Sequence, residues 1–298
     1  MNNSIAQEIK YSFKHGNMLT RFILINISVF LLVNLIGLFF FLFSVEPANR
    51  FSLVEWLAIP ADWKRLIFHP WTLISYMFLH EGFFHLLSNL IMLYFGGKLF
   101  IEYLGESRFT ATYFLGGISG AILFVVVFNL FPAFKSIAPV TVALGASASV
   151  LAVFVAIATY LPNYSVNLLL IGPVRLKFIA LFLVLLDLIS IDKGNSGGHI
   201  AHLGGALYGY FAMVQLRKGR DISQGFQLFF GKLQSIFRFK PKSHLYVKHK
   251  VSRNDADYNA KKKSKQERID LILDKISHSG YDSLSKEEKQ ELFNMSKE

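Results

Sequence analysis

The sequence predicts an all-α, polytopic membrane protein with a short helical tail. Apolar residues make up 53% of its 298 residues, charged residues only 17%, and phenylalanine alone occupies 30 positions. The apolar residues are concentrated in the first three quarters of the chain and the charges in the last quarter, which indicates a membrane body followed by a soluble region. Because there is no cysteine, disulfides and thiolate metal sites are excluded.

Six apolar segments are each expected to form a membrane-spanning helix. Their approximate ranges are 22–45, 83–97, 109–134, 147–161, 178–191 and 201–216. The first segment is too long for a cleaved signal peptide, so we expect it to be retained. Four regions follow: an N-terminal segment 1–20, a six-helix membrane domain 21–216, a basic juxtamembrane helix and linker 217–263, and a small helical hairpin 264–298.

Lysine and arginine residues set the expected orientation. With six spans and the N-terminus inside, only five of the 31 basic residues fall in outer segments: Arg50, Lys64, Arg65, Lys135 and Lys193. Both termini are therefore expected in the cytoplasm. With no recognisable targeting segment, a bacterial inner membrane is favoured. The net charge of +11 comes from basic residues that lie mainly in the expected cytoplasmic segments, where they would face anionic lipid headgroups. We therefore expect no nucleic-acid partner.

The segment before the fourth expected helix predicts an unusual backbone. Pro132, Pro139 and Gly145 disfavour a continuous helix there, so the helix should begin at Ser147. A helix from Ser147 to Leu161 is about 22 Å long, shorter than the roughly 30 Å core of a bilayer. Irregular backbone must then enter the membrane from outside, and Ser147 should lie at the floor of a water-filled cavity.

Ser147 and His202 are polar residues inside apolar segments, where polar groups are costly and usually functional. Small residues recur every four positions beside each of them: Ala148, Ala152 and Ala156, and Ala201, Gly205 and Gly209. Such a spacing lets two membrane helices approach closely, and it also occurs in ordinary helix packing without a functional site. The His202 imidazole could accept the Ser147 proton and return it to a leaving amine. No acidic residue is obviously placed to orient this histidine, because Asp187 lies on another segment and Asp192 in an outer loop, so we expect a dyad.

The second expected helix supplies further hydrogen-bond donors. His85 and Asn89 lie four positions apart, on one helical face, and could join the free backbone N–H of Ser147 in an oxyanion hole. Alternatively, they are buried polar residues that bridge helices. Zinc is the rival interpretation for four histidines, His80, His85, His199 and His202. Because no carboxylate or His-Glu-x-x-His spacing joins them, we expect no metal and no cofactor.

Three motifs resemble those of the rhomboid family of intramembrane serine proteases. The family carries Gly-x-Ser-Gly at the start of its fourth helix, His-x-x-x-Asn on the second and Ala-His-x-x-Gly-x-x-x-Gly on the sixth. This chain has Gly145-Ala146-Ser147-Ala148, then His85-Leu86-Leu87-Ser88-Asn89, and Ala201-His202-Leu203-Gly204-Gly205 continuing to Gly209. The three motifs occur in the family's order, and the resemblance covers about residues 20–216.

The resemblance implies an endopeptidase that cleaves the transmembrane segments of other membrane proteins near their outer ends. Ser147 would be the nucleophile and His202 the general base, while His85 and Asn89 would complete the oxyanion hole with the Ser147 N–H. Gly145, Gly205 and Gly209 would allow the close packing at the site. A catalytically silent relative that binds membrane proteins is one alternative. A transporter or channel is another, although no inverted repeat is apparent.

Two positions depart from the family pattern. Ala148 stands where a glycine usually follows the serine, and Trp71-Thr72 stands where a Trp-Arg pair is common. The added methyl group of Ala148 is expected to require a small steric adjustment without loss of catalysis. The loss of the arginine concerns the first loop, which keeps its tryptophans as interfacial anchors.

The tail is expected to contain one amphipathic helix and a hairpin. Apolar residues follow the sixth segment at helical spacing, with Lys232, Arg238, Lys240 and Lys242 among them: Phe226, Phe229, Phe230, Leu233, Ile236 and Phe237. This pattern predicts a helix on the inner leaflet with anionic lipids as partners. Residues 248–263 read as a linker. Capping boxes at Ser264–Glu267 and Ser285–Glu288 predict two short helices that pack together or bind a protein partner.

Overall fold

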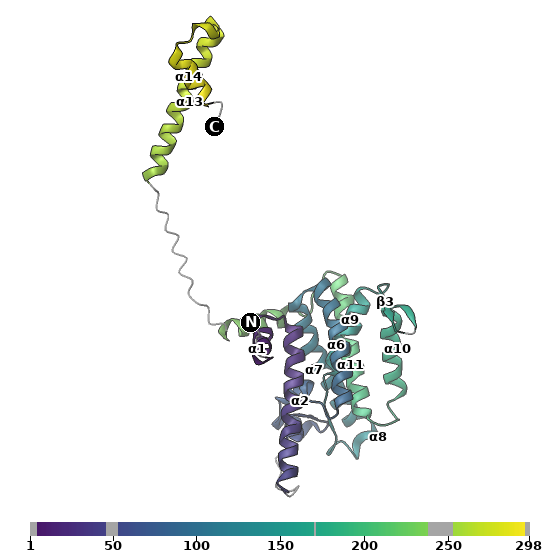
Figure 1. Ribbon diagram of the computed structural model, residues 1–298. Coiled ribbons are helices and arrows are strands. Elements are labelled where there is room, and N and C mark those ends of the chain that lie inside the picture. The colour runs from purple at the N-terminus through teal and green to yellow at the C-terminus, as the bar shows by residue number, and fades with distance from the viewer. Residues whose placement is uncertain (1–4, 46–52, 170, 238–252, 296–298) are drawn as a thin grey trace. The chain divides into compact units, whose positions relative to one another are not determined.

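The computed structural model describes residues 5–45, 53–169, 171–237 and 253–295. The chain forms two compact units, Met1–Arg238 and Phe239–Glu298 (Figure 1). Most of the described residues are helical, and the strands are limited to two short antiparallel pairs. The mainly helical class is therefore confirmed.

All six segments expected to be helical are helices in the first unit. They are α2 (Met18–Leu42), α6 (Phe83–Leu104), α7 (Glu106–Leu130), α9 (Ser147–Tyr160), α10 (Leu176–Ile189) and α11 (Ser196–Arg217). In the described part of the chain, three of them are long and apolar enough to cross a membrane by length and composition, namely α2, α6 and α7. A membrane protein is thus supported, and the count of six spans stays a prediction.

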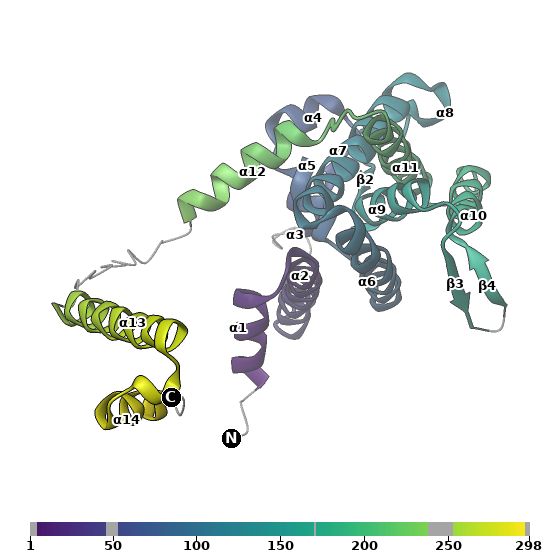
Figure 2. The ribbon, with the colours of Figure 1, turned by 90° about the horizontal axis from the view of Figure 1, so that it is seen from above.

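Helix α9 lies at the centre of the first unit, surrounded by α6, α7, α10 and α11 (Figure 2). Eleven of its 14 residues are buried. Glycines allow the close approach of α11, since a Cβ atom on Gly205 or Gly209 would overlap the carbonyl oxygen of Ala148 or Ala152. The small residues that were expected to allow close packing therefore do lie between these two helices.

Replacing Gly209 by alanine is expected to destabilise the protein by about 1–3 kcal/mol, because the added methyl group would force α9 and α11 apart. Gly37→Ala in α2 is the matched control, since a Cβ atom there meets nothing within 4 Å. The control should be neutral or slightly stabilising. Equilibrium unfolding of the two variants in detergent measures the difference, and equal stabilities would contradict this account of the packing.

The backbone before α9 is irregular, as the prolines predict. A short helix, α8 (Pro132–Lys135), is followed by strand β2 (Val142–Ala143), which pairs antiparallel with β1 (Ile59–Pro60). The Gly145 N–H then donates to the Tyr76 carbonyl oxygen at 2.9 Å. These bonds satisfy backbone groups that a buried loop would otherwise leave unpaired. They also fix the point at which α9 begins.

From residue 53 onwards, where the structure describes the first loop, it contains four short helices, α3 (Leu53–Leu57), α4 (Trp63–Phe68), α5 (Thr72–Ser75) and the 3₁₀ helix η2 (Tyr76–Phe78). The Trp71 indole donates to the Trp56 carbonyl oxygen at 2.9 Å. Thr72 is 1% exposed, and its hydroxyl donates to the His69 carbonyl oxygen at 2.6 Å. Thr72 is therefore packed and hydrogen-bonded within the loop, at the position where the rhomboid pattern commonly has an arginine.

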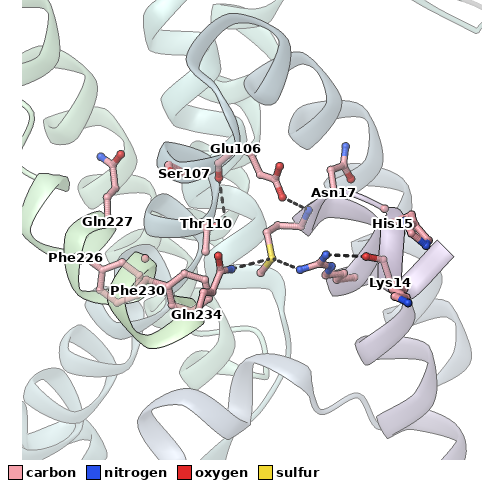
Figure 3. A pocket seen from close by; sticks show the side chains of 14 residues that line it. Lys14, His15, Asn17, Glu106, Ser107, Thr110, Phe226, Gln227, Phe230 and Gln234 are labelled. Carbon is pink, nitrogen blue, oxygen red and sulfur yellow. Dashed lines mark hydrogen bonds between the residues drawn. The ribbon is translucent and has the colours of Figure 1, made fainter. Parts of the chain in front are cut away.

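The N-terminal helix α1 (Ile5–His15) and helix α12 (Gln224–Phe237) border a polar cavity of about 480 Å³ beside α2 and α7 (Figure 3). Glu106 accepts the Met18 N–H at 2.6 Å, which places a carboxylate at the N-terminus of α2. Phe226 and Phe230 of α12 pack on Phe114 of α7, with ring centroids 5.8 Å apart in each pair. Part of the apolar face of α12 is therefore used for packing within the protein.

An ion pair fixes the turn that leads into α12. The Arg108 guanidinium donates to the Asp221 carboxylate at 2.8 Å. Burial alone would raise the pKa of Asp221, but hydrogen bonds from Ser223, Arg108 and Gln227 lower it below its usual range. A lowered pKa means that this contribution to stability is present at neutral pH and is lost as the pH falls through it.

In the second unit, α13 (Arg253–Ser279) is much longer than expected and is followed by the 3₁₀ helix η3 (Tyr281–Ser283) and α14 (Lys286–Met295). The expectation of a linker is wrong for residues 253–263, which begin α13, and residues 248–252 lie outside the described residues. The expectation of a capping box at Ser264 is also wrong. Neither glycine nor proline interrupts residues 253–263, and the alanines and lysines in this range favour a helix. Ser264 lies within α13, where its hydroxyl donates to the Lys261 carbonyl oxygen. The second capping box is confirmed, because Ser285 and Glu288 exchange backbone and side-chain hydrogen bonds. Arg238, Lys240 and Lys242 lie outside the described residues.

Candidate active site

Ser147 and His202 meet where the first residue of α9 faces α11. The distance between Ser147 Oγ and His202 Nε2 is 2.6 Å, and both residues are partly buried. The approach depends on the neighbouring glycine, since Gly205 lies one helical turn beyond the histidine and contacts the Ala148 backbone. The sequence thus predicts both members of the pair and the packing that brings them together.

Gly145 shapes the turn just before the serine. Its φ of 129° is a backbone conformation that residues other than glycine rarely adopt. A Cβ atom there would lie 3.0 Å from Cε1 of His85 and 3.3 Å from the Ser147 hydroxyl oxygen. Gly145 therefore combines a required backbone conformation with the space that the His85 ring occupies beside the serine.

Ala148, the departure from the family pattern, has its methyl group in a fitted space. The residue is 1% exposed and faces Gly120 of α7, where a Cβ atom would come within 2.8 Å of the Ala148 methyl. The glycine on α7 gives the room that the alanine on α9 takes. This complementarity supports the expectation that the steric adjustment is small.

Asp187 of α10 completes a chain of hydrogen bonds that the sequence analysis did not predict. Its Oδ1 lies 2.8 Å from Nδ1 of His202 and 2.8 Å from Nδ1 of His199. The expectation that no acidic residue orients His202 is therefore wrong, since α10 packs against α11 and carries the carboxylate to the histidine. A carboxylate that accepts the Nδ1 proton leaves Nε2 unprotonated, and here Nε2 faces the serine.

The other two residues predicted for the site, His85 and Asn89, line a cavity of about 220 Å³ beside the serine and histidine. His85, Asn89, Ser147, Asp187 and His202 all contribute to its wall. The Asn89 amide nitrogen lies 2.9 Å from the His85 carbonyl oxygen and 3.3 Å from Nε2 of His80. Both amide hydrogens therefore have partners, and an oxyanion would have to replace one of them.

His80 acts next to this cavity as a hydrogen-bond acceptor. Its Nε2 faces both the Asn89 amide and the Ala146 N–H, the latter at 3.4 Å. The residue is 3% exposed and links the second-helix donors to the backbone before Ser147. The sequence suggested His80 only as a candidate zinc ligand, and the fold instead gives it this positioning role.

A metal ion could be held by a set of residues other than the four histidines considered from the sequence. Ligand atoms of Asp187, His199 and His202 lie within 4.8 Å of one another. His80 is instead engaged with Asn89. The two histidines beside Asp187 already donate to its carboxylate, so hydrogen bonds alone account for the arrangement.

Comparison with known proteins agrees with the arrangement. The family model described as the rhomboid domain matches residues 68–219, and one described as a family of unknown function (DUF6576) matches residues 254–298. RHOMBOID-like protein 12, mitochondrial, of Arabidopsis thaliana is 30% identical over 158 residues, which is 50% of this chain and 47% of that protein.

A second relative is presenilin-associated rhomboid-like protein A, mitochondrial, of Danio rerio. It is 29% identical over 202 residues, which is 65% of this chain and 47% of that protein. The chain thus spans about half the length of these two curated relatives. Both names refer to mitochondria, which conflicts with the sequence-based expectation of a bacterial origin. The match to the rhomboid domain supports the expectation of a membrane protein.

Proposed function

The chain belongs to the rhomboid family, and from this membership we propose that it is an intramembrane serine endopeptidase that cleaves the transmembrane segments of membrane proteins. The observation that carries the proposal is the 2.6 Å contact between Ser147 Oγ and His202 Nε2 at the wall of a cavity. A serine hydroxyl is a weak nucleophile until a neighbouring base accepts its proton, and this contact supplies the base.

The proposed reaction uses this contact. Nε2 of His202 takes the hydroxyl proton as Ser147 Oγ attacks the carbonyl carbon of the scissile peptide bond. The same proton is then given to the leaving amine, so that the C–N bond breaks and an acyl-enzyme forms. A water molecule, deprotonated by His202, hydrolyses the ester and regenerates the serine. Asp187, bonded to Nδ1, would hold the imidazole in the required tautomer as a positioning residue.

The oxyanion of the tetrahedral intermediate would be held by three donors. The Ser147 N–H lies at the start of α9, where the first four N–H groups of a helix have no partner within it. His85 and Asn89 line the same cavity. Such donors stabilise charge most strongly in a site with little water.

Replacing Asn89 by alanine is expected to lower kcat by about 10²–10³-fold, the usual effect of removing one oxyanion donor. KM should change little, because the donor acts mainly on the transition state. Ser88→Ala is the matched control, since Ser88 lines the same cavity but its hydroxyl donates to the His85 carbonyl oxygen at 3.1 Å. Steady-state cleavage of a peptide reporter measures both variants, and equal kcat values would exclude Asn89 from the oxyanion hole.

The proposed topology has six membrane spans, with both termini in the cytoplasm and the active site near the outer end. The placement of Ser147 at the start of a helix of only 14 residues supports this arrangement, since about 21 Å of helix cannot cross the whole hydrocarbon core. The remaining thickness would belong to the irregular segment from 131 to 146. Water could then reach Ser147 from the outer surface.

The proposed substrates are single membrane spans containing small and helix-breaking residues near their outer ends. A stable helix hides its carbonyl groups, so the scissile segment must unwind before it meets Ser147. We also propose that α12 binds anionic lipids, and that the pair of helices α13 and α14 binds a protein partner. Phe229 of α12 supports the first of these proposals, since 63% of its side chain is exposed.

The test is cleavage of a reporter with one such span by the purified protein in detergent and in lipid vesicles. We expect one product, its formation blocked in parallel with covalent labelling of Ser147 by a fluorophosphonate. Lys98→Gln, which alters an exposed residue of α6 outside the site, is the control for handling of the protein. No product and no labelling by a folded protein would instead support a catalytically silent membrane-protein binder.

A further inference from the structure

A third cavity, of about 690 Å³, lies between α9, α10 and α11, further along these helices from the active site. It is hollow because three small, buried side chains line it: Ala158, Ala180 and Ala206. Leu181 and Leu207 stand at its margin with 54% and 61% of their side chains exposed. The cavity therefore opens sideways, from an apolar floor towards the surroundings of the helices.

Two cations lie at one end of this cavity. Lys177 is the second residue of α10, and Arg217 is the last residue of α11. Lys177 Nζ donates to the Asn163 side-chain oxygen at 3.1 Å, and Arg217 Nη2 donates to the Tyr160 carbonyl oxygen at 2.8 Å. Both acceptors are neutral. Within the described residues neither cation forms an ion pair, and the cavity wall contains no acidic side chain.

We propose that this cavity binds an anionic phospholipid, with its phosphate between Lys177 and Arg217 and an acyl chain along the apolar wall. The lining fits this ligand, since charge is confined to one end and the remaining wall is apolar except for Thr159 and Tyr210. The Thr159 hydroxyl already donates to the Val155 carbonyl oxygen. Arginine and lysine are the usual phosphate-binding residues, and uncompensated positive charge favours an anionic headgroup over a zwitterionic one. An extended peptide segment would need hydrogen-bonding partners along its length, which this wall does not offer.

The proposed ligand differs from the lipid surface predicted for α12. That surface is an amphipathic helix face with no defined chain-binding cavity. The cavity described here would retain individual lipid molecules through detergent extraction. Its occupancy does not depend on Ser147 or His202, so the lipid site and the protease function can fail separately.

The test is native mass spectrometry of the full-length Ser147→Ala protein in detergent, titrated with phosphatidylglycerol or phosphatidylcholine. We expect one tightly retained phosphatidylglycerol and at least about tenfold weaker retention of phosphatidylcholine. The double variant Lys177→Gln/Arg217→Gln should lower phosphatidylglycerol affinity by about tenfold or more. Lys193→Gln, in the exposed turn beyond the opposite end of α10, is the matched control and should leave this affinity unchanged.

Ala206→Phe gives an independent test, because a ring would fill the cavity without changing any charge. It should lower retention of the lipid while the thermal midpoint shows that the fold persists. Equal binding of the two lipids by the unsubstituted cavity would overturn the proposal, even if both variants failed to fold. Displacement of the lipid by glycerol phosphate would overturn it as well, by identifying a simple phosphate site.

Discussion

Ser147→Ala and His202→Ala are each expected to reduce cleavage by about 10⁴-fold or more, and the double variant should lose little beyond either single change. The reason is the 2.6 Å contact between the two side chains, which makes them act as one unit. Once the hydroxyl is gone, the imidazole has no nucleophile to activate, and without the imidazole the hydroxyl stays protonated.

Initial rates of reporter cleavage by the three variants measure this coupling. Thermal unfolding in the same detergent should show that all three keep the native fold, because both side chains lie at the edge of a cavity. Independent, multiplicative losses would mean that the two residues act in separate steps. Persistent cleavage by folded Ser147→Ala would identify another nucleophile and overturn the proposed mechanism.

The sequence predicts this pair because each member carries a strong local signal. Prolines and Gly145 end the irregular segment before Ser147, and α9 begins at that residue. On α11, the glycines that follow His202 give the spacing of a close helix contact, and they meet the backbone of α9. Local backbone chemistry and helical periodicity are therefore sufficient to place these residues.

Asp187 could not be placed in the same way, because α10 has no repeated small residues that would mark the face packing against α11. The rotation of α10 about its axis decides whether the carboxylate faces α11, and an apolar helix without a strong periodic pattern gives little information on rotation. A signal was nevertheless present. Asp187 is the one acidic residue in an otherwise apolar segment, and such a residue is functional more often than not.

The error in the tail has a different origin. Ser264 and Glu267 have the correct spacing for a capping box, but the same spacing is tolerated inside a helix. The four residues directly before Ser264, Ala260 and three lysines, are good helix formers, and α13 continues through the serine from its start at Arg253. Ser285, by contrast, follows Gly280 and η3, where the chain has already left the helix, and there the capping box forms.

Replacing Asp187 by asparagine should lower kcat by about 10²–10⁴-fold with little change in KM. The amide has nearly the same volume, but it can donate a hydrogen bond to Nδ1, which leaves the proton on Nε2, where the serine proton must be received. It also lacks the negative charge that stabilises the imidazolium formed during attack. The geometric basis is the 2.8 Å distance from Oδ1 to Nδ1 of His202.

The separation of kcat from KM distinguishes this positioning role from a purely structural one, which would alter folding or substrate binding as well. Fluorophosphonate labelling of Ser147 should slow in parallel with kcat, because both depend on removal of the hydroxyl proton. Asp192→Asn is the matched control, since this acidic residue lies in the exposed turn after α10. His199→Asn should have a smaller effect than Asp187→Asn, as it removes one partner of the carboxylate but leaves the bond to His202. If Asp187→Asn keeps kcat within about threefold of the wild type, the site works as a serine and histidine dyad, and the carboxylate serves only to join α10 to α11.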